Sequence, residues 1–269
     1  MSWWGKLAGG AFGFMLGGPL GALLGAALGH NFDKGLERFG GVDLLDQGER
    51  ERVQTAFFTA TFSVLGYLAK VDGRVSRAEI SFAEQVMRQL SMDVEQRKAA
   101  IALFSEGKQA NFPLEGVLEQ FRRECQGRAT LLQLFLEIQI SAVWADGEFS
   151  DAERYALETI RQHLRVPKVV FDAIRRRIEA VHGPASGVGG GRRSADHGQT
   201  LDTAYAILGV DAATSDVEVK KAYRRLLSQH HPDKLVAKGL PEEMMQLAAR
   251  KTHEIKQAYE TIKACRAES

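Results

Sequence analysis

The feature that most constrains this chain is an uncharged run near its N-terminus. No side chain from Leu7 to Gly29 carries a charge. A helix over this run would rise roughly 34 Å, which is enough to cross a hydrocarbon core of about 30 Å. Two tryptophans and Lys6 precede the run, and such side chains anchor membrane helices at the interface. The run therefore predicts a single transmembrane helix over residues 7–29.

Glycines recur at every fourth position in and around this helix. Small residues at this spacing let two helix backbones approach closely and favour a right-handed crossing of about −40°. We expect this stripe to form a homodimer interface. Its members are Gly5, Gly9, Gly13, Gly17, Gly21, Gly25 and Gly29. A glycine-rich anchor that does not dimerise is the simpler alternative.

A secreted leader is an alternative for the same segment, because residues 27–29 weakly resemble a small-residue cleavage site. The apolar run is longer than in most signal peptides, and only Lys6 supplies positive charge before it, so we expect the helix to stay as an anchor. Lys34 and Arg38 follow the helix and favour a cytoplasmic location for the bulk of the chain. Residues 1–6 would then be periplasmic.

Charge balance and cysteine content narrow the function classes. Lys and Arg total 35 and Asp and Glu total 34, for a formal net charge of +1, which argues against a nucleic-acid partner. The two cysteines, Cys125 and Cys265, are too few for a disulfide framework and are typical of a reducing compartment. No phosphate-binding glycine loop, nucleophile elbow or metalloprotease helix is present, so we predict no enzyme, no catalytic residue and no cofactor.

After a juxtamembrane segment over residues 30–52, residues 53–182 predict an all-helical domain. Apolar side chains recur there at spacings of three and four, with no long apolar–polar alternation. The residues that show this spacing most clearly are Phe57, Phe58, Phe62, Leu65, Leu68, Leu131, Leu132, Phe135, Ile138 and Ile140. Near the end of the domain, the run Arg175-Arg176-Arg177 predicts a solvated face.

Two stretches of this domain resemble each other. Asp72-Gly73 and Asp146-Gly147 each supply a turn, and each turn is followed by Ser-x-x-Glu, the pattern of a capping box. The duplication predicts two helix-turn-helix units packed about a pseudo-twofold axis.

The paired turns resemble those of the TerB-like (tellurite-resistance) helical domain, where acidic turn residues are suspected of binding metal. A hard cation would take oxygen ligands, and the candidates are Asp72, Glu79, Asp146 and Glu153. The spacing lacks the ligand-dense loop of an EF-hand, and capping alone explains both Ser-x-x-Glu pairs. We therefore predict caps here and no metal site.

A glycine-rich segment over residues 183–200 predicts a flexible linker with a reach of roughly 20–25 Å. Beyond it, residues 201–269 predict a helical hairpin. The first long helix begins after Thr214 or Ser215 and ends before Pro232, because proline disfavours helix in the preceding residue. Its outward basic side chains are Lys220, Lys221, Arg224 and Arg225. The last helix is expected from about Pro241 to Ala264.

This segment resembles the J-domain of the DnaJ family. The matching stretches are Tyr205-x-x-Leu208-Gly209-Val210, Lys220-Lys221-Ala222-Tyr223-Arg224-Arg225-Leu226, His231-Pro232-Asp233-Lys234 and Ala258-Tyr259-Glu260. The resemblance implies binding to the ATP state of a DnaK-type chaperone and stimulation of its ATPase. It assigns that contact to His231, Pro232, Asp233 and Lys234 and to the basic residues Lys220, Lys221, Arg224 and Arg225. Outside this context, His231 and Asp233 are ordinary loop residues.

A zinc site is a further alternative for this segment, built from His230, His231, His253 and Cys265. These residues lack the paired short spacings of zinc ligands, so we do not predict one.

The order of the parts is similar to that of the DjlA family of bacterial membrane-anchored co-chaperones, over essentially the whole chain. The resemblance implies a single-pass protein of the inner membrane, with a periplasmic N-terminus and cytoplasmic domains. It also implies a DnaK-type chaperone, unfolded or membrane-proximal client proteins and the lipid bilayer as partners. The alternative function is an envelope-stress sensor or adaptor whose middle domain binds an ion or a protein.

Overall fold

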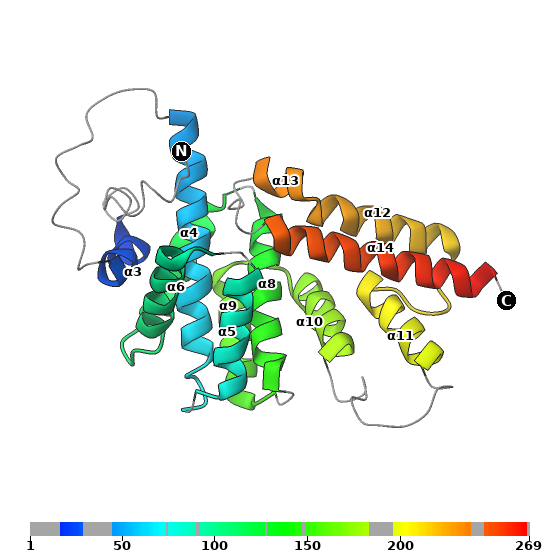
Figure 1. The fold of residues 1–269 in the computed structure, drawn as a ribbon, viewed down its shortest axis with the longest axis horizontal. Coiled ribbons are helices and arrows are strands. Elements are labelled where there is room, and N and C mark those ends of the chain that lie inside the picture. Colours follow the sequence, from blue (N-terminus) through cyan, green and yellow to red (C-terminus); the bar gives the residue numbers. More distant parts are fainter. Residues whose placement is uncertain are drawn as a thin grey trace.

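All regular elements that the computed structural model describes are helices (Figure 1), which confirms the predicted all-α fold class. The described residues are 17–28, 45–73, 75–89, 92–126, 128–146, 149–182, 196–237 and 245–267. Within these residues, no helix is both long and apolar enough to span a bilayer.

The middle domain is a bundle built around two buried helices. Its helices are α4 (Leu45–Leu68), α5 (Arg77–Gln89), α6 (Val94–Gly107), α7 (Leu114–Glu124), α8 (Ala129–Val143), α9 (Asp151–His163) and α10 (Lys168–His182), with the short 3₁₀ helix η2 (Trp144–Asp146) after α8. Residues 55–66 of α4 and 134–140 of α8 are buried on every side, as expected of helices at the centre of a bundle. Because α4 begins at Leu45, the end of the predicted juxtamembrane segment belongs to this helix.

Aromatic side chains fill the centre of this bundle. Phe121 of α7 contacts Phe57 of α4 edge to face, with ring centroids 5.8 Å apart, and its centroid lies 4.8 Å from that of Phe135 of α8. All three rings are fully buried. The middle domain therefore has one continuous core that joins both halves of the predicted repeat.

Two glycines let α4 and α6 cross at close range. A Cβ atom on Gly66 would lie 2.0 Å from the carbonyl oxygen of Phe104, and one on Gly107 would lie 1.8 Å from that of Ser63. Neither backbone oxygen can move far within its helix, so only glycine fits at these two positions.

Helix α3 (Gly18–Leu28) lies against α6 and α7 and buries Leu20 and Leu24. Gln120 of α7 holds its start: the Leu20 amide donates to Gln120 Oε1 over 2.9 Å, and Gln120 Nε2 donates to the Gly17 carbonyl over 2.9 Å. Gly17 lies outside the helix at a φ of +55°, so the helix predicted over 7–29 is interrupted there. The remainder of that range lies outside the described residues.

The C-terminal segment contains the expected helical hairpin and two shorter helices. Its elements are α11 (Asp196–Leu208), α12 (Asp216–His230), α13 (Pro232–Ala237) and α14 (Met245–Ala267). Helices α12 and α14 run side by side (Figure 1) and stack Tyr223 on Tyr259, with centroids 4.2 Å apart. Helix α11 begins within the predicted linker, which is therefore shorter than 183–200. Helix α13 was not predicted, because we expected a loop from the proline onward.

Candidate functional site

The His-Pro-Asp sequence lies at the junction of α12 and α13. Helix α12 ends at His230, and His231 is extended, with φ −63° and ψ 124°. This is the conformation expected before proline, and Pro232 then begins α13. The turn fixes the direction of the two side chains that flank the proline, with His231 Nδ1 3.9 Å from Asp233 Oδ2.

Of the predicted contact residues at this tip, His231 and Asp233 are accessible to a partner, and Lys234 contacts α12. The side chain of His231 is 45% exposed and that of Asp233 is 84% exposed. Lys234 bends back and donates from Nζ to Ser228 Oγ over 2.7 Å. The tip therefore presents an imidazole and a carboxylate at the surface.

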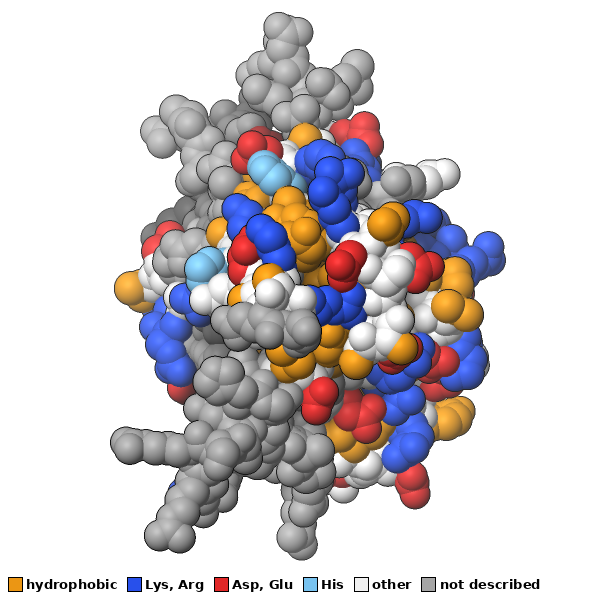
Figure 2. All heavy atoms as spheres, turned by 90° about the vertical axis from the view of Figure 1, so that its right-hand side faces the viewer, with side chains coloured by type: hydrophobic (Ala, Val, Ile, Leu, Met, Phe, Trp, Pro, Cys, Tyr) orange, Lys and Arg blue, Asp and Glu red, His pale blue; other side chains and the backbone are white. Residues whose placement is uncertain are grey.

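The four basic residues of α12 are all exposed, as the sequence predicts. Among the described residues, Lys220, Lys221, Arg224 and Arg225 make no ion pair with an acidic side chain. Figure 2 shows the J-domain side of the molecule, where Lys and Arg side chains alternate with Asp and Glu. The four cations of α12 therefore lie within a surface of mixed charge and not within a broad basic surface.

Next to the exposed motif lies a buried polar cluster that sequence reasoning missed. Glu137 of α8 is hydrogen-bonded to the guanidinium of Arg177 of α10, and its Oε1 lies 3.5 Å from His230 Nε2 at the end of α12. The Glu137 and His230 side chains are 4% and 6% exposed. Thr252 of α14 donates from Oγ1 to the His230 carbonyl over 2.9 Å. The cluster joins the hairpin tip to the middle domain.

Burial and neighbouring charges set the protonation of this cluster. Burial by itself raises the pKa of a carboxyl group, but the charges of Arg177, His230 and Lys251 outweigh it and hold the pKa of Glu137 below its usual range. Burial lowers the pKa of His230, and the attraction of Glu137 offsets only part of that effect. At neutral pH the cluster holds an ionised carboxylate, a guanidinium and a neutral imidazole.

The arginine run is not a uniform solvated face. Arg176 is exposed and Arg175 pairs with Glu179 at 3.5 Å, but the Arg177 side chain is only 11% exposed and pairs with the buried Glu137. The prediction is wrong for Arg177, because a charged side chain can be buried when an opposite charge compensates it. The only signal in the sequence is that Glu137 is the single charged residue of α8.

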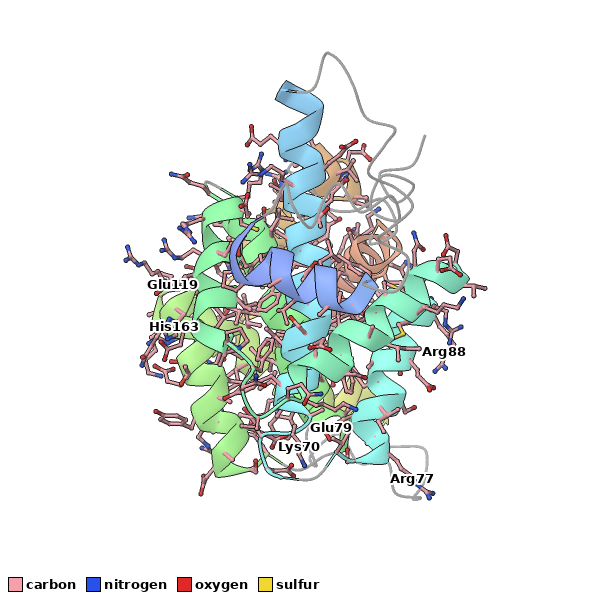
Figure 3. The ribbon with its side chains drawn as sticks, turned by 90° about the vertical axis from the view of Figure 1, so that its left-hand side faces the viewer. Lys70, Arg77, Glu79, Arg88, Glu119 and His163 are labelled. Carbon is pink, nitrogen blue, oxygen red and sulfur yellow. The ribbon has the colours of Figure 1, made fainter. Side chains whose placement is uncertain are left out.

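The acidic turns of the middle domain are capping boxes, as predicted. The Ser76 amide donates to Glu79 Oε2 over 2.7 Å, and the Ser150 amide donates to Glu153 Oε2 over 2.8 Å. Burial raises the pKa of Glu79, and the nearby charges of Asp72 and Glu153 raise it further. Figure 3 labels Glu79 and Lys70 at this end of the bundle.

Two metal sites were considered from the sequence, one at the acidic turns of the middle domain and one at the histidines and Cys265 of the C-terminal segment. Neither has a complete ligand set in the part of the chain that the structure describes. No group of three or more His, Cys, Asp or Glu side chains there is close enough to hold an ion. The carboxylates of Glu79 and Glu153 are engaged in their caps, and the side chain of Asp146 lies outside the described residues. Of the four zinc candidates, His230 is buried beside Glu137 while His253 is exposed.

Comparison with known families identifies all three parts of the chain. Residues 1–39 match the model for the co-chaperone DjlA transmembrane domain, residues 58–176 match tellurite resistance protein TerB, and residues 203–266 match the DnaJ domain. Co-chaperone protein DjlA of Coxiella burnetii is 43% identical over 269 residues, covering 99% of both chains. The chain belongs to the DjlA family of co-chaperones.

Other DjlA proteins match equally completely. Those of Salmonella typhimurium and Escherichia coli K12 are 43% and 42% identical, and each alignment covers 98% of both chains. No solved structure matches the chain significantly. The DjlA family match confirms a co-chaperone with a transmembrane domain, a TerB domain and a J-domain, and it places the His-Pro-Asp tip in the J-domain.

Proposed function

We propose that this chain recruits a DnaK-type chaperone to the inner membrane and stimulates its ATP hydrolysis. The observation that carries the proposal is the tip of the J-domain, where His231 and Asp233 are held at a fixed turn and remain exposed. A side-chain pair presented in this way suits recognition of another protein. No serine or cysteine of the motif is placed for nucleophilic chemistry, so the stimulated hydrolysis belongs to the partner.

The exposed basic residues of α12 support the same contact. Unpaired charges on one helix accelerate encounter with an acidic surface, and they set orientation before the short-range contacts form. His231, Pro232, Asp233 and Lys234 then make those contacts. To change the rate of hydrolysis, they must bind one conformation of the chaperone more tightly than another. The resemblance to J-domains implies that the favoured conformation is the ATP-loaded one.

The membrane arrangement follows from the same partner. DnaK-type chaperones and ATP are cytoplasmic, so the J-domain and the middle domain lie in the cytoplasm and the N-terminus in the periplasm. The glycine stripe from Gly5 to Gly29 would pair two anchors once α3 has left α6 and α7 for the bilayer, so that a homodimer presents two J-domains to unfolded or membrane-proximal clients. Pairing would raise the local concentration of J-domains at the bilayer.

The test is a steady-state ATPase assay with purified DnaK-type chaperone and the full chain in detergent micelles. We expect the wild-type chain to stimulate hydrolysis and His231→Gln to lose the stimulation completely, because the imidazole is part of the contact. His253→Gln is the matched control, since His253 is an exposed histidine on α14 away from the motif. Unchanged stimulation by His231→Gln, with the fold intact by circular dichroism, would refute the proposal.

A further inference from the structure

The contact between the J-domain and the middle domain covers both flanks of the His-Pro-Asp motif. His230, immediately before the motif, is buried against Glu137 and Arg177. Leu235, shortly after it, is 1% exposed and belongs, together with Ala248 of α14, to the apolar cluster that contains the core of the middle domain. The motif itself is accessible, but a protein that encloses the tip would meet the middle domain on either side of it.

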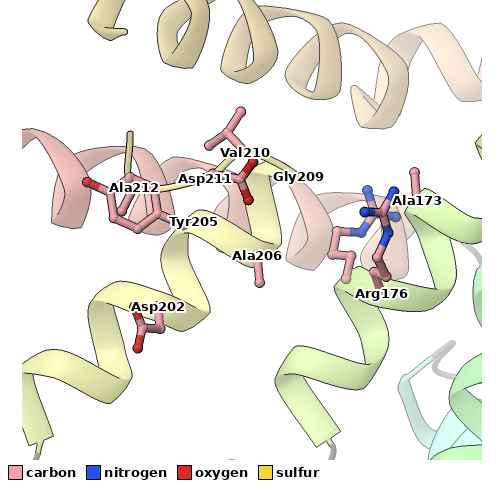
Figure 4. Close-up of a pocket in the computed structure, with 10 residues that line it drawn as sticks. Ala173, Arg176, Asp202, Tyr205, Ala206, Gly209, Val210, Asp211 and Ala212 are labelled. Atoms are coloured by element: carbon pink, nitrogen blue, oxygen red, sulfur yellow. The ribbon is translucent and has the colours of Figure 1, made fainter. Parts of the chain in front are cut away.

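The same contact is incompletely packed. One cavity of about 240 Å³ is lined by Gln133 and Glu137 of the middle domain and by Arg225 and His230 of the J-domain. A second, of about 350 Å³, lies between α10 and α11. Figure 4 shows it between Ala173 and Arg176 on one side and residues 202–212 on the other. Protein cores are close-packed, so the contact between the two domains is tightly packed around Leu235 and Ala248 and open at these two cavities.

The polar cluster at this surface is only partly satisfied. Glu137 Oε2, Arg177 Nε and His230 Nδ1 have no hydrogen-bond partner among the described residues. Buried polar groups without partners favour any rearrangement that returns them to water. If the J-domain moved away, Glu137 and Arg177 would still pair with each other, because both belong to the middle domain. Of the three polar groups, only His230 would lose its charged neighbours.

We propose that Glu137 and Arg177 form a docking site on the middle domain for the J-domain tip, which the J-domain must leave before a DnaK-type chaperone can enclose the motif. Apolar burial of Leu235 and Ala248 holds the docked state, and the unsatisfied cluster and the two cavities keep it weak. The need for release before chaperone binding rests on the proposed function. The docking of the J-domain tip on the middle domain does not.

Release would raise the affinity for the chaperone without adding any contact to it. When only a fraction of molecules is competent to bind, the apparent dissociation constant rises by the inverse of that fraction. A substitution on the middle domain that disfavours docking should therefore lower the concentration of this protein needed for half-maximal stimulation. The maximal rate should stay the same, because the J-domain is unchanged.

The variant that tests docking is Ala173→Arg in the full chain in detergent micelles. Ala173 is exposed on α10 and borders both cavities, so a long charged side chain wedges the domains apart without entering the core of the middle domain. Ala152→Arg, at an exposed position of α9, is the matched control. Glu137→Gln is the second variant, which removes the buried charge and keeps the side-chain shape.

Hydrogen exchange of residues 226–237 and the chaperone ATPase are measured on each variant. We expect Ala173→Arg to speed exchange in this segment at least tenfold and to lower the half-maximal concentration severalfold, with Ala152→Arg unchanged in both. Unchanged exchange in Ala173→Arg would overturn the docking site, and faster exchange with an unchanged half-maximal concentration would overturn its role in access. Exchange reports docking even if the wild-type chain does not stimulate the chaperone, which separates this proposal from the proposed function.

Discussion

In the middle domain, the central turns of α4 and α8 are buried on every side, whereas each long helix of the J-domain keeps a face in water. The buried residues of the J-domain core are Ala204, Tyr205, Leu208, Val219, Leu226, Ile255, Ala258 and Ile262. The middle domain has a much larger core in which phenylalanine rings contact across several helices. Its stability comes from apolar burial around a common centre.

The J-domain compensates for its small core with polar contacts at its open end. Arg266 of α14 donates to the Tyr205 hydroxyl over 3.0 Å and to the Ala212 carbonyl over 2.9 Å, and it pairs with Asp216. At the opposite end, the hairpin tip rests on the middle domain. The middle domain thus has a large core, and the J-domain has a small one. The end of the J-domain that carries the His-Pro-Asp motif is the end that contacts the middle domain.

The largest expected effect is on the middle domain. Phe121→Ala removes the ring that joins Phe57 to Phe135, and we expect it to lower the free energy of unfolding by about 3–5 kcal/mol. Denaturant unfolding followed by circular dichroism measures the change. Tyr155→Ala, at a side chain 77% exposed on α9, is the control and should shift stability by no more than about 0.5 kcal/mol. Similar losses for both variants would contradict a core centred on Phe121.

A smaller effect is expected in the J-domain. Arg266→Met removes the contacts to Tyr205 and Ala212, and we expect a loss of about 1 kcal/mol, because the partner Asp216 is largely solvated. Hydrogen exchange of α11 and α14 should show the loss, while exchange of α4 and α8 stays constant. Lys263→Met, at an exposed position on α14, is the control. Equal destabilisation of α4 would mean that the two domains share one cooperative unit.

The smallest effect concerns pH and the contact between the domains. Burial lowers the pKa of His230 from its usual 6.5, amid the charges of Glu137, Arg177, Lys251 and Glu254. Its contribution to docking is therefore complete above about pH 6.5 and is lost as the pH falls below that value. Between pH 7.5 and 5.5, exchange of residues 226–237, corrected for its intrinsic pH dependence, should become faster.

His230→Gln should abolish this pH dependence, because glutamine does not titrate, and His253→Gln should retain it. If His230→Gln keeps the full pH dependence, another group controls the contact. The two substitutions thus test whether the contact between the J-domain and the middle domain depends on the His230 imidazole.

Local signals predicted the helix caps and the end of α12 correctly. The Ser-x-x-Glu pairs form caps, Ser215 caps α12, and the proline after His231 ends that helix. The outward direction of the basic residues of α12 followed from helical spacing alone. These features depend on residues within one or two turns, where backbone geometry leaves few alternatives.

The sequence did not predict helix α13 or the start of α11, because neither carries a strong local signal. A short helix after proline and a polar helix after a glycine-rich stretch both lack the apolar periodicity that identifies longer helices. Their formation depends on packing, as when Leu235 is buried in the apolar cluster that contains the middle-domain core.

The sequence by itself determined the all-helical architecture, the capped turns and the exposed His-Pro-Asp motif, because each is encoded over a few neighbouring residues. Only the tertiary structure decided that Arg177 meets Glu137 across 40 positions and that Gln120 holds Leu20 across 100. Periodicity shows which face of a helix is apolar but not which helix covers it. For that reason the buried charges that join the two domains could be found only after the chain was folded.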